Sequence, residues 1–94
     1  MPRIVVTRLG ENRYGVCIEE GASESEHEVT VTPEAVTRYA GPGVSPERLL
    51  QASFAFLLER EPKEAIMRQF DLPVIERYFP EYPRQIRKRL AHSA

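Results

Sequence analysis

The thiol of Cys17 and the imidazoles of His27 and His92 are the first side chains to consider for nucleophilic or general-base chemistry. Catalysis by a cysteine requires an imidazole within hydrogen-bond reach of the sulfur, and no local motif directs either histidine toward Cys17. Because Cys17 lies in an alternating run typical of a strand, we predict that it packs as a small apolar residue. We assign no catalytic residue and predict that the protein is not an enzyme.

Glu26 and Glu28 flank His27, and these residue types bind metal ions when their side chains converge. In a strand, however, the residues on either side of a histidine point to the opposite face of the sheet. The two carboxylates therefore cannot reach the same ion as the imidazole. We predict a solvated surface histidine and no metal site.

Neither acid–base catalysis nor phosphate binding is indicated by the remaining motifs. The paired carboxylates, Glu59 with Glu61 and Glu19 with Glu20, lack a neighbour that would hold one of each pair protonated. The GPG sequence at residues 41–43 precedes a helix but lacks the lysine and the glycine spacing of a phosphate-binding loop. We predict no cofactor.

The sequence RQIRKRLAH, residues 84–92, is basic and contains no acid. In a helix its cations lie apart from the apolar positions Ile86 and Leu90. Two interpretations stay open: a solvated last helix whose cations complement the negative end of the helix dipole, and a contact surface for a small anion, RNA or an acidic partner. The candidate interaction residues are Arg84, Arg87, Lys88 and Arg89.

Residues 1–32 predict an antiparallel sheet of about three strands. Two strand-like runs, residues 3–9 and 14–18, flank a short turn-forming stretch and therefore predict a hairpin. EVTVT at residues 28–32 alternates in the same way and supplies the third strand. The intervening EEGASESEHE, residues 19–28, holds five glutamates and is predicted to be a solvated loop.

Two helix-start signals follow, in which a hydroxyl cap precedes proline and glutamate: TPE at residues 32–34 and SPE at residues 45–47. The first predicts a short helix that glycine ends at position 41. The second predicts the principal helix, about residues 46–60, which is apolar nearly all round and therefore lies in a core or at a dimer interface. A third helix is expected from Glu61 and Pro62, with Ile66, Met67 and Phe70 facing inward.

FDLPVIERYFPEYPRQI, residues 70–86, holds three of the eight prolines of the chain. Pro73 and Pro83 suit first helical turns, and Pro80 ends a helix, so each proline has a structural reason. We predict that these prolines delimit two short helices and that Tyr78, Phe79 and Tyr82 face a core.

Length and composition fit one domain, residues 1–94, with a β-rich part at 1–32 and a helical part at 33–92. The predicted fold class is α+β, with four to five helices packed on one face of the sheet. A net charge of −1 gives no overall attraction to nucleic acid or anionic lipid, and one cysteine excludes an internal disulfide. No signal peptide is expected, and the longest apolar stretch, residues 52–58, is too short to span a membrane. We predict a cytoplasmic bacterial protein with no membrane contact.

The sequences FAFLLEREPKEAI (residues 54–66) and FDLPVIERYFPEYP (residues 70–83) resemble a family of small bacterial proteins with no established activity. In that family a VTVTP-type strand and a short helix lead into the same long helix and aromatic helix. The likeness covers residues 28–83. It implies relatedness and supplies no site.

Residues 28–59 also resemble, more weakly, a ribbon-helix-helix DNA-binding unit, in which strands from two copies pair and read the major groove. The resemblance implies that Glu28, Thr30 and Thr32 contact bases. Glu28 and its acidic neighbours Glu24 and Glu26 depart from the pattern because they would repel phosphates.

The leading hypothesis is a small non-enzymatic interaction or regulatory protein with an unknown protein partner, which forms a homodimer through residues 49–58. The alternative is a nucleic-acid-binding regulator of ribbon-helix-helix type.

Overall fold

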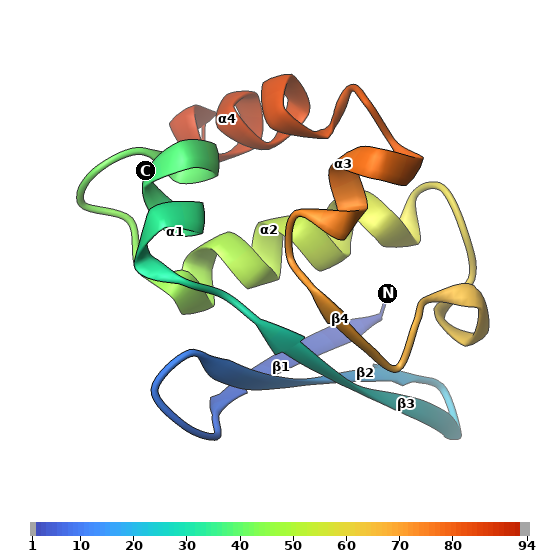
Figure 1. Ribbon diagram of the computed structural model, residues 1–94. Helices are drawn as coiled ribbons and strands as arrows, with labels where there is room; N and C mark the ends of the chain where they lie inside the picture. Colours follow the sequence, from blue (N-terminus) through green and yellow to red (C-terminus); the bar gives the residue numbers. More distant parts are fainter. Residues whose placement is uncertain (1, 93–94) are drawn as a thin grey trace.

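In a computed structural model, which describes residues 2–92 but not the side chain of His92, all the helices lie on one side of a β-sheet. Figure 1 shows the sheet beneath, α2 lying across it, and α1, α3 and α4 farther from the sheet. The α+β class is therefore confirmed. None of the helices in this part of the chain combines the length and apolar character that crossing a bilayer requires.

The sheet has four strands in the order β1-β2-β3-β4. Their bounds are Arg3–Arg8 (β1), Arg13–Glu20 (β2), Ser23–Thr30 (β3) and Gln69–Asp71 (β4). The first three strands are antiparallel, whereas β4 runs parallel to β3. The sheet is thus mixed, with one strand more than predicted, and the part of the chain that was predicted to be helical supplies that strand.

The predicted solvated loop at residues 19–28 is wrong. β2 and β3 form a long hairpin that turns at Gly21, whose φ of 61° suits a residue without a side chain. This strand tolerates acidic residues because Glu24 and Glu26 point to the face of the sheet that no helix covers. The inward residues Ser25 and His27 are polar, so the apolar alternation that would reveal a strand is missing.

Both helix-start predictions are confirmed. α1, Pro33–Ala40, begins where the Thr32 hydroxyl accepts a hydrogen bond from the Ala35 amide at 3.2 Å. α2, Pro46–Leu58, begins in the same way, with the Ser45 hydroxyl 3.1 Å from the Arg48 amide. In each helix proline occupies the first turn, where its missing N–H costs no intrahelical hydrogen bond.

The predicted third helix is wrong. The chain makes only one 3-10 turn, η1 at Lys63–Ala65, and then extends into β4. Two backbone hydrogen bonds that flank the pairing hold the segment against β3: Glu28 N to Arg68 O at 2.7 Å and Leu72 N to Thr30 O at 3.0 Å. Pairing with β3 therefore replaces the intrahelical hydrogen bonds that the proline start signal had predicted.

α2 is the central element of the core, because its own chain covers it on two sides. Toward the sheet, the Phe54 ring lies 5.5 Å from His27 and 6.1 Å from Phe70, measured between ring centroids. Away from the sheet, the Phe56 ring lies 5.4 Å from Tyr82. The prediction that this helix is surrounded by apolar neighbours is met within one copy of the chain.

The aromatic segment forms α3, Val74–Tyr78, and α4, Tyr82–His92. Tyr82 is fully buried and Phe79 is half-buried, but Tyr78 is 67% exposed. The prediction that all three rings face a core is therefore wrong for Tyr78. Ile75 is the residue of α3 that is buried in the core. Tyr78, at the end of this short helix, lies outside the core.

A buried hydrogen bond joins α2 to α4 and has a defined direction. The Ser53 hydroxyl lies 2.7 Å from the Leu49 carbonyl and 2.7 Å from the Tyr82 hydroxyl. Ser53 has one proton, which it donates to the carbonyl because a carbonyl can only accept. Tyr82 must therefore donate to Ser53.

We expect Ser53→Ala to destabilise the protein by about 1–3 kcal/mol, because it leaves the buried Tyr82 hydroxyl without an acceptor. Tyr82→Phe should cost only about 0.5–1.5 kcal/mol, since Ser53 keeps its bond to Leu49. The double variant should be no less stable than Ser53→Ala. Urea unfolding of the four proteins measures these values, and additive costs would contradict the hydrogen bond.

Burial and a hydrogen bond to Glu76, 2.8 Å away, raise the pKa of Tyr39 to about 12. The folded state thus favours the neutral phenol, whereas an unfolded tyrosine ionises near pH 10. Stability should therefore fall as the pH rises from about 10 toward 12. Tyr39→Phe should reduce this alkaline loss, as measured by urea unfolding at neutral and alkaline pH. An undiminished loss would exclude a contribution from Tyr39.

Candidate functional site

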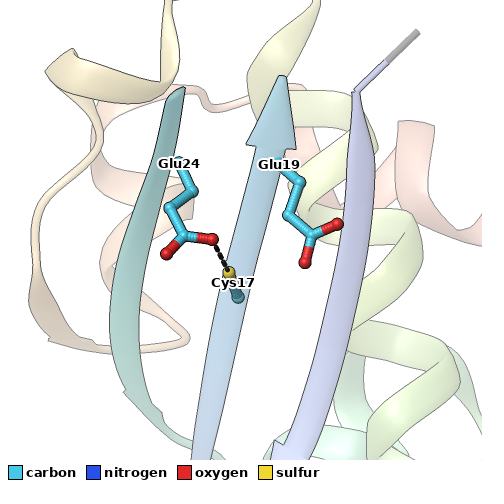
Figure 2. Close-up of side chains that lie close together, drawn as sticks. All are labelled: Cys17, Glu19 and Glu24. Carbon is cyan, nitrogen blue, oxygen red and sulfur yellow. Dashed lines mark hydrogen bonds between the residues drawn. The ribbon is translucent and has the colours of Figure 1, made fainter. Parts of the chain in front are cut away.

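The face of the sheet away from the helices is open and carries the Cys17 thiol between two glutamates (Figure 2). Cys17 is half-buried and does not pack in the core as predicted. Its sulfur lies 3.7 Å from Glu24 Oε2, and the donor atoms of Cys17, Glu19 and Glu24 all lie within 4.8 Å of one another. These three atoms are close enough to bind one cation, a cluster that the sequence hides because Glu24 belongs to the neighbouring strand.

The electrostatics of this cluster keep the thiol neutral. Partial desolvation raises the pKa of Cys17, and the negative charges of Glu24 and Glu19 raise it further. The reactive form of cysteine is the thiolate, which this environment disfavours.

His27 is not the solvated residue that was predicted: it is only 4% exposed and points from β3 toward the helices. Its Nδ1 lies 2.8 Å from the Met67 carbonyl oxygen, and its Nε2 lies 2.8 Å from the Ser25 hydroxyl. Cys17 is on the opposite face of the sheet, so these two residues do not form a catalytic pair. The side chain of His92 lies outside the described residues.

The predicted basic surface on α4 is smaller than its sequence indicated. Arg89 pairs with Glu59, and Arg87 donates to the Arg38 carbonyl at the end of α1, at 2.6 Å. Arg84, Arg87 and Lys88 are exposed, and Arg89 is half-buried. A contact between this surface and an anionic partner stays a prediction.

The two predicted modes of assembly would use β3 and α2. Residues 28–30, the part of β3 that belongs to the predicted ribbon, are paired with β2 on one side and with β4 on the other, so the strand pairing of a ribbon-helix-helix dimer would have to displace β4. Six residues of α2 are buried within the same chain, namely Leu49, Leu50, Ser53, Phe54, Phe56 and Leu57. A homodimer through residues 49–58 stays a prediction.

The strongest candidate site is an apolar pocket of about 370 Å³ between the end of α2, the η1–β4 segment and α3. The pocket is lined by Tyr78 and Met67, and Met67 is 40% exposed. These are two of the three exposed large apolar side chains in residues 2–92. Glu61 is its only charged lining residue. The full lining is Leu57, Glu61, Ala65, Ile66, Met67, Phe70, Ile75, Tyr78 and Phe79.

The walls of this pocket are held by contacts between distant parts of the chain. The Met67 carbonyl is bonded to His27, and Phe79 packs edge-on against Phe56 with 5.9 Å between the ring centroids. The sequence did not reveal the pocket because Met67 had been assigned to the inner face of a helix. An exposed methionine and tyrosine become recognisable as a site only when the fold places them on one pocket.

Comparison of the chain with protein-family models, with curated proteins and with solved structures finds no match. The resemblance to a small bacterial family therefore stays a prediction.

We expect Glu24→Gln to lower the pKa of the Cys17 thiol and to speed its alkylation by iodoacetamide at mildly alkaline pH by about two- to tenfold. The variant removes a negative charge and replaces the carboxylate that accepts the thiol proton by an uncharged, weaker amide acceptor. Glu11→Gln, in the turn between β1 and β2, is the charge-matched control and should have little effect. Equal rates in all three proteins would show that Glu24 does not control the thiol.

Proposed function

We propose that the protein is a small non-enzymatic interaction protein whose apolar pocket receives an apolar side chain of a partner protein. The observation that supports this proposal is the presence of Met67 and Tyr78, both exposed, on one apolar pocket. Large apolar side chains that stand in water beside a concave apolar surface are typical of binding sites.

The residue types suit protein recognition. Tyrosine offers a large contact area and loses little conformational freedom on binding, and a hydroxyl remains for a hydrogen bond at the edge of the interface. Methionine is flexible and adapts to partner side chains of different shape. Glu61, half-buried in the lining, can accept a hydrogen bond from an N–H group of the partner.

The pocket volume of about 370 Å³ lies near the lower end of the range of ligand pockets, about 300–1,000 Å³. One side chain with its neighbouring backbone therefore suits it better than a large cofactor. The Tyr78 ring is mostly exposed, so a partner buries this ring only if it also covers the rim of the pocket. A protein surface can do this, whereas a small molecule held inside the pocket cannot.

We expect peptides selected from a random phage-displayed library against the wild-type protein to share an aromatic or large aliphatic residue. Tyr78→Ser should weaken their binding at least tenfold, measured by fluorescence anisotropy of the labelled peptides. Both proteins should give the same circular dichroism spectrum, because Tyr78 contributes little to the core.

Leu9→Ser is the matched control, because Leu9 is also a large exposed apolar residue, 49% exposed, but lies beyond β1 and not on this pocket. Peptide binding should survive this change. Selected peptides that bind Tyr78→Ser as tightly as the wild type, or a selection that yields no common apolar residue, would refute the proposal.

A further inference from the structure

We propose that Ser25 is a nucleophilic serine, activated by His27, that accepts an acyl group from an activated ester. The site is separate from the Met67–Tyr78 pocket, and the proposal does not depend on the function proposed for that pocket. It makes the protein the acceptor of a covalent modification and requires no catalytic turnover.

The hydrogen bonds of His27 determine which nitrogen can act as a base. The Met67 carbonyl, 2.8 Å from Nδ1, can only accept, so Nδ1 carries a proton. In the neutral imidazole Nε2 then has the free lone pair. The Ser25 hydroxyl, 2.8 Å from Nε2, therefore donates its proton to that lone pair. The Ser25 hydroxyl is thus hydrogen-bonded to a base, His27, and the Met67 carbonyl orients that base.

The base is fixed in place and shielded, whereas the hydroxyl is reachable. His27 is buried against the Phe54 ring, and the peptide segment that bears the Met67 carbonyl is held to β3 by the bond from Glu28 N to Arg68 O. Ser25 is half-buried and opens into a pocket of about 320 Å³. This pocket is lined by Glu24, Ser25, Glu26, His27, Lys63, Glu64, Ile66 and Arg68.

The pocket also supplies a cation for the oxygen that becomes negative during acyl transfer. Lys63 is buried and already engaged by Glu64 at 2.6 Å and by Glu20 at 3.5 Å. Arg68 is exposed, and within residues 2–92 its guanidinium has no hydrogen-bond or ion-pair partner. It is therefore the group available to stabilise a developing oxyanion.

The acyl transfer to Ser25 proceeds by addition to the ester and loss of its alcohol. Ser25 Oγ attacks the ester carbonyl carbon while its proton passes to His27 Nε2, and the carbonyl electron pair moves to oxygen. When the carbonyl re-forms, the bond to the leaving alkoxide breaks, and His27 returns the proton to that alkoxide. The products are an ester on Ser25, a free alcohol and a neutral imidazole.

An alkyl fluorophosphonate tests the hydroxyl directly, because this reagent labels activated serines with loss of hydrogen fluoride and spares ordinary ones. We expect one adduct per chain by intact mass, located at Ser25 by peptide mapping. Ser25→Ala should abolish it. Ser23→Ala is the matched control, since within residues 2–92 the Ser23 hydroxyl bonds to the Glu20 carbonyl and not to an imidazole, and it should label like the wild type.

The role of the fold is tested on the same reaction. Labelling of the wild type should disappear in concentrated urea, which separates Ser25 from His27, and Arg68→Ser should slow it several-fold without unfolding the protein. p-Nitrophenyl acetate should transfer its acetyl group to Ser25, identified by peptide mapping. A folded wild type that takes no label at Ser25, or labelling of the same extent in urea, would overturn the proposal.

Discussion

The burial of α2 on two sides is the constraint on which the rest of the structure depends. Phe54 packs on the sheet side and Phe56 on the side of α3 and α4, so one helix carries both layers of the core. The polar pair of Ser53 and Tyr82 tolerates this burial only because each hydroxyl has a partner. Because most of its apolar residues are covered in this way, α2 contributes only its end, at Leu57, to the apolar pocket.

The segment from η1 to β4 lines both of the pockets for which a role is proposed. It is held to β3 by the His27 side chain and by backbone hydrogen bonds, and Ile66 contributes to the pockets that contain Tyr78 and Ser25. One buried imidazole therefore has two consequences: its Nδ1 positions a wall of the apolar pocket, and its Nε2 faces a hydroxyl. The sites share a support but differ in chemistry.

Charge is distributed according to which surfaces are covered. Glu19, Glu24 and Glu26 lie on the open sheet face, where desolvation and their negative charges raise the pKa of the Cys17 thiol. In the helical layer several cations serve the fold: Arg60 stacks 3.7 Å from the centre of the Phe56 ring, and Arg87 bonds to the end of α1. A count of basic residues in α4 therefore overestimates the cationic surface offered to a partner.

The sequence alone determined the features that depend on neighbouring residues. Thr32 and Ser45 cap helices through amides three residues away, and the alternation of Tyr14, Val16 and Ile18 identifies the buried face of β2, so the α+β class follows from local patterns.

Only the tertiary structure decided the features that depend on distant partners. β4 exists because β3 offers an edge, His27 is buried because the Met67 carbonyl, forty positions along the chain, accepts its proton, and the pocket at Tyr78 forms where α3 meets the segment before β4. Local sequence patterns cannot predict these contacts, because each contact joins groups that are far apart in the sequence and that only folding brings together.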